Sequence, residues 1–127
     1  MNRKKQEKKL DDIWSALIKS ISGFCCQRCG DDDTIIDPHH IIKRTHKRLR
    51  WTVSNGIGLC RYKCHRQAED NPVTFLEWME DKEPERMEML NAIKRKGVKI
   101  YNVIELAEIE KDLKQQLKQI SEELIPF

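Results

Sequence analysis

The sequence predicts an α+β fold, in which a small metal-stabilised core is flanked by helices at both ends. Apolar residues recur at three- and four-residue spacing near the start of the chain and again in its last part, as in amphipathic helices. Between them, residues 24–66 are rich in Gly, Asp, Cys and His and too poor in apolar residues to form a core alone. We therefore expect an N-terminal amphipathic helix (1–23), a metal-bound core (24–82) and a C-terminal helical extension (83–127).

The composition fits one modest domain. The chain has 127 residues, of which 39% are hydrophobic and 35% charged. No apolar run approaches the roughly 20 residues needed to cross a bilayer. The charged N-terminus lacks the apolar stretch of a signal peptide. We expect a cytoplasmic protein with no membrane association, in which the five cysteines are reduced and four of them, in two close pairs, bind metal.

Several helices are expected in order along the chain. Apolar spacing predicts a first helix over residues 8–20, ended near Gly23. The only β-prone pieces of the core are residues 34–36 and 51–53. A short helix follows Cys64 and breaks before Pro72, and Asn71 with Pro72 resembles an N-cap followed by proline at the first helical position. Pro84 opens another helix, which Gly97 closes.

The last helix begins after Asn102, a candidate N-cap, and has an apolar pattern close to a heptad repeat. Two interpretations are open, a coiled-coil dimer and an amphipathic helix packed on its own domain. The second is favoured because three heptads with a charged interruption at Glu110 are weak evidence for a coiled coil. The residues of the pattern are Val103, Leu106, Leu113, Leu117, Ile120 and Leu124.

Two spaced cysteine pairs indicate a structural zinc site. Cys26 and Cys29 are separated by two residues, and Cys60 and Cys64 by three, gaps that let both thiolates of a turn reach one ion. Four thiolates complete a tetrahedral zinc site, which would close the loop between them. The alternative is that these cysteines are small buried hydrophobes. Cys25 is left over, because the two-residue gap favours Cys26 as the ligand.

Positive charge is concentrated in one segment. Between Pro38 and Arg66 there are eight basic residues and no Asp or Glu, although the net charge of the whole chain is only +3. A basic field at one site suits a polyanion such as nucleic acid. In isolation such a run would be interpreted as a solvated basic face. Its coincidence with a histidine cluster favours the nucleic-acid interpretation.

Three histidines and an asparagine form the most specific pattern. Hydrolysis of a phosphodiester needs a base to activate water and a cation to neutralise charge. At the end of a strand, His39 and His40 would point in different directions, so that one binds metal while the other faces the water. His65 could complete the metal site, and Asn55 could hold the loop that orients His40. Singly, these residues are more often a strand end and a turn; together they favour catalysis.

With these motifs together, the chain resembles an HNH nuclease of the ββα-metal (His-Me finger) type with a four-cysteine zinc site. It is similar in particular to the NinG-like group associated with phage and prophage recombination. The resemblance covers about residues 24–80. The matching residues are Cys26, Cys29, His39-His40-Ile41, Leu49-Arg50-Trp51, Asn55, Leu59-Cys60, Cys64-His65-Arg66 and Asn71-Pro72, followed by Phe75 and Trp78.

The resemblance implies roles for individual residues. His40 would be the general base, oriented by Asn55, while His39 and His65 would bind a divalent cation, Mg²⁺ or Mn²⁺. Zinc would be held by Cys26, Cys29, Cys60 and Cys64. Arg44 and Arg50 are candidates for phosphate contacts because a guanidinium can bind two phosphate oxygens. The full set of expected nucleic-acid-binding residues is Arg44, Lys47, Arg48, Arg50 and Arg61.

The chain departs from the family pattern at two positions. The second cysteine pair has one residue more than many members, which affects the placement of Cys64 and His65. Many members also have a histidine four residues after the position of His65, where this chain has Glu69. On a helix these two positions share a face, so Glu69 is either an oxygen ligand of the catalytic cation or a solvated glutamate.

The expected function is therefore a metal-dependent DNA endonuclease, acting in phage or prophage DNA processing or recombination. The alternative is a non-catalytic, zinc-stabilised nucleic-acid-binding or recombination-accessory protein. A zinc-stabilised helical adaptor that binds protein through its last helix is a third possibility. Retention of all three of His39, His40 and His65 favours the enzyme.

Overall fold

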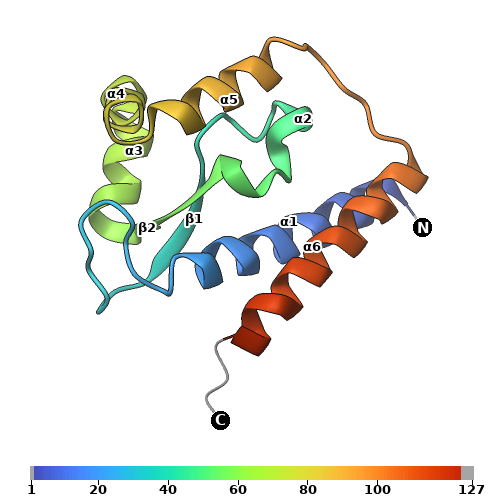
Figure 1. Cartoon of the computed structure of the whole chain (residues 1–127), viewed down its shortest axis with the longest axis horizontal. Helices are drawn as coiled ribbons and strands as arrows, with labels where there is room; N and C mark the ends of the chain where they lie inside the picture. The colour runs from blue at the N-terminus through green and yellow to red at the C-terminus, as the bar shows by residue number, and fades with distance from the viewer. Residues whose placement is uncertain (1, 124–127) are drawn as a thin grey trace.

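The computed structural model describes residues 2–123 and shows an α+β protein that is mostly helical, with one small antiparallel sheet. Leu124, the last residue of the expected heptad pattern, lies outside the described residues. Figure 1 shows the two terminal helices on one side of the sheet and the middle helices on the other. The elements in order are α1 (Arg3–Ile21), β1 (Ile36–His40), α2 (Lys47–Arg50), η1 (Val53–Asn55), β2 (Gly56–Cys60), η2 (Arg61–His65), α3 (Arg66–Asp70), α4 (Pro72–Lys82), α5 (Pro84–Lys94) and α6 (Val103–Glu123).

The sheet consists of β1 and β2, paired from Ile36 opposite Cys60 to His40 opposite Gly56. Because side chains alternate along a strand, the sheet has two distinct faces. The α1 face, toward the first helix, includes His40 and the two glycines of β2. The α3 face, toward the helix that follows β2, includes Asp37 and His39. Neighbouring histidines therefore belong to opposite faces, as expected for the end of a strand.

The second strand does not lie where the β-prone residues suggest. Residues 51–53, expected from composition to favour a strand, lie at the end of α2 and the start of the 3₁₀ turn η1, and the strand is Gly56–Cys60. Trp51 is 5% exposed and packs with residues of α1 and α6 instead of joining the sheet. Tertiary packing has thus overridden local β-propensity.

Helices α1 and α6 lie side by side and share an apolar cluster (Figure 1). Leu10, Trp14 and Leu17 of α1 pack with Leu106 and Leu113 of α6, each of them at most 2% exposed. Leu106 and Leu113 of the heptad pattern are thus buried within the chain, as the second interpretation expects, whereas Val103 is 49% exposed. Glu110, which interrupts the pattern, lies 3.5 Å from Lys9 Nζ of α1.

Two helix starts were correctly placed by the sequence. The Asn102 side chain accepts a hydrogen bond from Glu105 N at 2.8 Å, and the Glu105 carboxylate accepts one from Asn102 N at 3.1 Å, forming a capping box at α6. Pro72 begins α4, but Asn71 caps it differently from our expectation. The Asn71 side chain makes no capping bond, and its backbone carbonyl accepts from Phe75 N.

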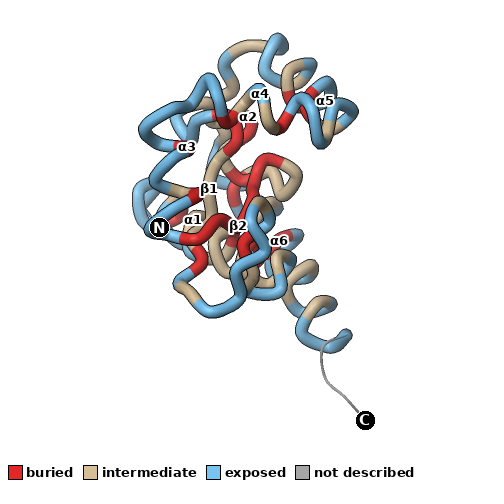
Figure 2. The backbone as a smooth tube through the Cα atoms, turned by 90° about the vertical axis from the view of Figure 1, so that its left-hand side faces the viewer, coloured by how far each residue is buried: buried red, intermediate tan, exposed pale blue. Residues whose placement is uncertain are grey.

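The second apolar cluster lies on the α3 face of the sheet, where α4 and α5 cover it. Phe75 and Met79 of α4 and Met87 and Leu90 of α5 are buried there with Ile57 of β2. Figure 2 shows buried segments gathered around the strands, with exposed backbone on the outer helices. Among residues 2–123, no helix is both long enough and apolar enough to cross a membrane.

Candidate metal centre and histidine site

Four cysteines form a cluster that can hold a structural metal such as zinc. The sulfur atoms of Cys26, Cys29, Cys60 and Cys64 all lie within 4.8 Å of one another. Cys29 Sγ and Cys60 Sγ are 3.8 Å apart, close to the spacing of about 3.8 Å that a tetrahedron with Zn–S bonds of about 2.3 Å requires. The fifth cysteine, Cys25, is outside the cluster, and its thiol donates to Gly23 O at 3.4 Å.

The thiols of this cluster differ in how easily they ionise. Burial by itself raises the pKa of Cys26, but backbone N–H donors of Cys29, Cys60 and Arg28 outweigh it and bring the pKa to about 6. Burial and the neighbouring thiols raise the pKa of Cys64. Four ionised sulfurs this close would repel one another. A cation bound among them offsets this repulsion and so allows the remaining thiols to lose their protons.

The extra residue of the second cysteine pair is accommodated by a π-helical turn. Residues Arg61–His65 form η2, in which each turn takes in one residue more than in an α-helix. Cys60 precedes this turn and its Sγ accepts a hydrogen bond from Cys64 N at 3.3 Å. The turn therefore brings Cys64 to the cysteine cluster while His65 faces the sheet. Cys64 thus joins the other three cysteines, and His65 lies beside Asp37.

A second potential ligand set lies on the α3 face of the sheet. Ligand atoms of His39, His65 and Glu69 all lie within 4.8 Å of one another. His65 Nε2 is 3.2 Å from Glu69 Oε1, one turn further along the helix, and the Glu69 side chain is 62% exposed. The sequence therefore placed Glu69 correctly beside His65. Two imidazole nitrogens and one carboxylate oxygen suit a divalent cation, with coordination positions left open for water or substrate.

Asp37 is a member of this site that sequence reasoning missed. His65 Nδ1 lies 3.0 Å from Asp37 Oδ2, and Arg61 donates to the same carboxylate from Nη2 at 2.9 Å. The hydrogen bond from Arg61 is the main reason that the pKa of Asp37 is lowered. Strand alternation is the signal that could have found it, because Asp37 is two residues before His39 and shares its face.

The contacts of His65 indicate its tautomer. An ionised carboxylate only accepts hydrogen bonds, so Nδ1 of His65 must carry the proton that is donated to Asp37. With Nδ1 donating to Asp37, Nε2 is the nitrogen left to bind a cation, and Glu69 Oε1 lies 3.2 Å from it. A cation between Nε2 and the Glu69 carboxylate would satisfy both groups. This carboxylate–histidine arrangement is the usual support of a metal-binding imidazole.

His39 is held as a neutral imidazole. Burial, together with the nearby His65 and His40, lowers the pKa of His39 to about 4. The ring meets the edge of Phe75 with centroids 4.9 Å apart. An unprotonated imidazole fixed by an aromatic neighbour is suited to binding a cation.

His40 lies on the α1 face and has a different environment. Its Nε2 is 2.9 Å from the backbone carbonyl oxygen of Arg50. Because a carbonyl only accepts, Nε2 must carry the proton, and Nδ1 of the neutral ring keeps its lone pair. Burial lowers the pKa of His40, which favours the neutral ring. The flat face of the ring stacks on the indole of Trp14, with centroids 4.0 Å apart and planes 8° from parallel.

Asn55 holds the loop between the two strands. It is fully buried, and its Oδ1 accepts from Ile42 N at 2.8 Å. Its Nδ2 donates to Ile42 O at 2.9 Å and to Leu49 O at 3.1 Å. These three bonds fix the backbone next to Arg50, whose carbonyl accepts from His40. The geometry is that of an orienting residue acting through the loop.

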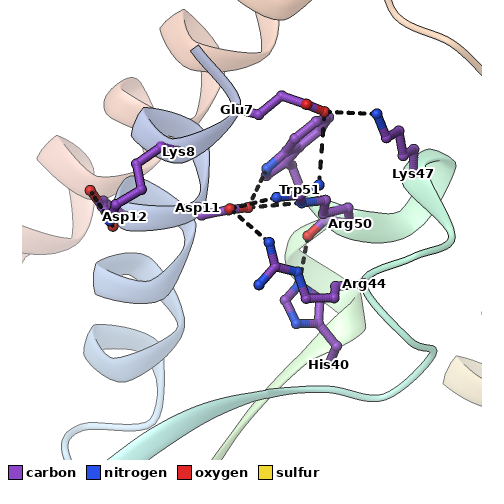
Figure 3. A network of polar contacts seen from close by, with 9 residues as sticks. All are labelled: Glu7, Lys8, Asp11, Asp12, His40, Arg44, Lys47, Arg50 and Trp51. Carbon is purple, nitrogen blue, oxygen red and sulfur yellow. Dashed lines mark hydrogen bonds and ion pairs between the residues drawn. The ribbon is translucent and has the colours of Figure 1, made fainter. Parts of the chain in front are cut away.

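The basic segment is not free of acids in space. Arg50 Nη2 is 2.7 Å from Asp11 Oδ2, Lys47 Nζ is 3.1 Å from Glu7, and Arg61 is paired with Asp37. Figure 3 shows Glu7 and Asp11 of α1 turned toward Lys47 and Arg50. A segment without acids in the sequence is thus partly neutralised by a distant helix. A phosphate contact by Arg50, whose side chain is 13% exposed, would require its pair with Asp11 to open.

The other expected nucleic-acid-binding residues are more accessible. The Arg44 side chain is 60% exposed and meets Asp11 at 3.3 Å. Arg48 donates from Nε to Gly97 O at 3.1 Å. The exposed ion pair of Arg44 holds its partner weakly, so it yields readily to another anion.

Comparisons of the chain with protein-family models, with curated proteins and with solved structures found no match. The interpretation of the site therefore depends on the geometry of this chain and on the resemblance of its motifs.

Proposed function

We propose that the protein is a metal-dependent DNA endonuclease of the HNH, or ββα-metal, type. One observation carries the proposal. Adjacent residues at the end of β1 belong to different sites, since His39 joins His65 and Glu69 while His40 is held by the Arg50 carbonyl with Nδ1 unprotonated. A ligand set and a base on neighbouring residues are what hydrolysis of a phosphodiester requires.

The α3 face would hold the catalytic cation. Bound by His39, His65 and Glu69, Mg²⁺ or Mn²⁺ would neutralise charge on the scissile phosphate and on the leaving 3′ oxygen. Imidazole ligands suit Mn²⁺ better than Mg²⁺, so we expect Mn²⁺ to support the higher activity. Asp37 would keep His65 in the tautomer that presents Nε2 to the ion.

His40 would be the general base. Its Nδ1 takes a proton from the attacking water, while its Nε2–H stays on the Arg50 carbonyl. The carbonyl dipole then stabilises the imidazolium that forms. Asn55 contributes by fixing the loop in which this carbonyl lies.

Zinc would hold the two strands together at their outer ends. Cys26 and Cys29 precede β1, whereas Cys60 ends β2 and Cys64 follows it. Gln27, between the first two cysteines, also bonds β2, because Gly58 N donates to its side chain at 2.7 Å and its own N–H donates to Gly58 O at 2.8 Å. The metal would thus stabilise the sheet that positions both histidines.

DNA is the proposed substrate, with Arg44, Lys47, Arg48 and Arg61 as the contacts to its phosphates and Arg50 available only if its ion pair opens. The resemblance to NinG-like nucleases suggests processing of phage or prophage DNA during recombination. Binding through such contacts falls steeply with salt concentration.

The test is conversion of supercoiled plasmid to nicked or linear DNA with Mn²⁺, Mg²⁺ or EDTA. We expect cleavage by the wild type with either cation, and a loss of about 10² to 10⁴-fold in His40→Ala. His46→Ala is the matched control, because His46 is outside both ligand sets, and it should cut normally. Circular dichroism checks that each variant is folded. Full activity in His40→Ala would rule out the mechanism, and DNA binding without cleavage by the wild type would favour the non-catalytic alternative.

A further inference from the structure

Helix α1 contacts the proposed base directly. Trp14 stacks face to face on His40, with ring centroids 4.0 Å apart and planes 8° from parallel. The indole is itself immobilised, because it is 1% exposed and its Nε1 donates to Thr52 O at 2.9 Å. The imidazole of His40 is therefore stacked on an immobilised indole, and this indole belongs to a helix outside the region of the HNH resemblance.

Two constraints on His40 complement each other. The hydrogen bond from Nε2 to the Arg50 carbonyl fixes the rotation of the ring within its plane. The stack on Trp14 fixes the plane itself and closes one face of the ring. With only one of these two constraints, the ring could still rotate or tilt, and Nδ1 would move away from the attacking water. Together they leave Nδ1 as the one unprotonated nitrogen, at a defined position.

The same helix also fixes the acceptor of that hydrogen bond. Asp11, three residues before Trp14 and therefore on the same side of α1, accepts from Arg50 Nε at 3.0 Å and from Arg50 Nη2 at 2.7 Å. It accepts in addition from Trp51 Nε1 at 2.9 Å. Figure 3 shows the Asp11 carboxylate at the centre of this network, with His40 below Arg50. Helix α1 thus contacts both the imidazole of His40, through Trp14, and Arg50, through Asp11.

Close packing of α1 on the sheet depends on two glycines of β2. A Cβ built on Gly56 would lie 2.3 Å from Ile18 Cδ1 and 2.7 Å from Trp14 Cζ2, and one on Gly58 would lie 2.8 Å from Ser22 Cβ. Real Cβ atoms do not approach other atoms so closely. A larger residue at position 56 would push Trp14 away from His40.

From this geometry we propose that Trp14 is a positioning residue for His40, supported by Asp11, so that α1 is part of the catalytic centre. The proposal rests on the proposed function for the identity of His40 as the base. The constraint on the His40 ring is a separate physical claim. It is measurable whether or not the protein cuts DNA.

The competing explanation is that Trp14 only fills the core. Three variants of the full chain separate the two. Trp14→Leu keeps an apolar side chain but removes the stack, Trp14→Phe keeps an aromatic plate, and Leu10→Ala damages the same apolar cluster without touching His40. Each is measured at a temperature at which circular dichroism shows it to be folded.

The first readout is the tautomer of His40, from long-range ¹H–¹⁵N NMR correlations of its ring. We expect wild type, Trp14→Phe and Leu10→Ala to show the Nε2–H form alone. Trp14→Leu should show averaging between the two tautomers, because a ring that can tilt leaves the Arg50 carbonyl for part of the time. A single Nε2–H tautomer in Trp14→Leu would overturn the proposal, even if that variant is less stable.

The second readout is the kinetics of DNA cleavage. In Trp14→Leu we expect kcat to fall about ten-fold or more with little change in KM, because a misplaced base slows the chemical step without weakening substrate binding. Trp14→Phe should recover most of kcat, and Leu10→Ala should keep it. Equal losses of kcat in Trp14→Leu and Leu10→Ala would contradict the proposal. If the wild type does not cut DNA, the proposed function fails, and the NMR result still decides the role of Trp14.

Discussion

The two faces of the β1–β2 sheet are assembled in different ways. On the α3 face, the potential ligands and the groups that orient them come from residues 37–69, with Phe75 behind them. On the α1 face, His40 depends on Trp14 and Asp11 from the first helix, which is in turn covered by α6. The potential ligand site is thus local in sequence, whereas the orientation of His40, the proposed base, depends on residues far apart. Sequence motifs therefore identify the potential ligand site far more readily than the residues that orient His40.

The largest effect on stability should come from the cysteine cluster, which lies at one end of the sheet and therefore supports both faces. We expect Cys26→Ser, or removal of zinc by a strong chelator, to cost at least about 3 kcal/mol, or roughly 15 °C in Tm. Cys25→Ser changes the preceding residue, which is outside the cluster, and should leave Tm nearly unchanged. Calorimetry together with a zinc assay measures both. Equal Tm values for the two variants would contradict a structural zinc site.

The next effect should come from Asn55, which supports the α1 face through the loop. Asn55→Ala leaves one N–H and two carbonyls of the loop without their bonds, so we expect a loss of about 3 kcal/mol in urea unfolding. Asn55→Asp should be similarly harmful, because a carboxylate oxygen would face two carbonyls. Asn91→Ala, on α5, is the control and should cost under about 1 kcal/mol. A small effect in both Asn55 variants would mean that the loop is held by other contacts.

Asp37 provides a test confined to the α3 face. We expect Asp37→Asn to weaken binding of Mn²⁺ by about 10 to 100-fold, because His65 loses the carboxylate that fixes its tautomer. Titration calorimetry of the zinc-loaded protein measures this. The fold and the tautomer of His40, on the other face, should not change. Asp33→Asn, an exposed position before β1, should bind Mn²⁺ normally; equal affinities in the two variants would remove Asp37 from the site.

The smallest effect concerns Asp11 and the α1 face. Burial alone raises the pKa of Asp11, but hydrogen bonds from Arg50 and Trp51 outweigh it, so the pKa lies below its ordinary value of 3.8. A lowered pKa means that the stabilisation is present above pH 3.8 and is lost as the pH falls further through the pKa of the folded state.

We therefore expect Asp11→Asn to cost about 1 to 2 kcal/mol at pH 7. The difference from the wild type should shrink below pH 3.8. Urea unfolding across this range measures it. A difference that is constant with pH would show that the ion pairs of Asp11 do not stabilise the fold.

Much of the fold could be predicted from the sequence, because most of its helices are marked by local signals such as apolar spacing and proline. The apolar spacing located α1 and α6, and the prolines that begin α4 and α5 placed those helices correctly, although α1 begins at Arg3, five residues before the expected start. Strand β2 was missed because Gly56-Ile57-Gly58 has little β-propensity, and its glycines reflect the approach of α1. The short helix α2 and the 3₁₀ turn η1 lie on either side of Trp51, which is buried against α1 and α6, and they had no local signal.

The candidate site was predictable to the extent that it depends on spacing. The cysteine gaps and the positions of His39, His65 and Glu69 predicted two groups of residues that do lie close together in the structure. The Arg50 carbonyl could not be foreseen, because backbone acceptors leave no trace in the side-chain pattern. Trp14 resembled an ordinary core residue of an amphipathic helix. The pairing of the basic segment with Glu7 and Asp11 was likewise hidden by their distance in sequence.

The packing of α6 on α1 also has a consequence for the order of folding. During synthesis, α1 emerges long before α6, which begins at Val103, so the apolar side chains of α1 have no partner over that interval. We expect Trp14 to settle on His40 late, after this long-range contact has formed. A nascent chain would then acquire its zinc-bound strands before it acquires an oriented base. The proposed nuclease activity would therefore be absent until the last helix is in place.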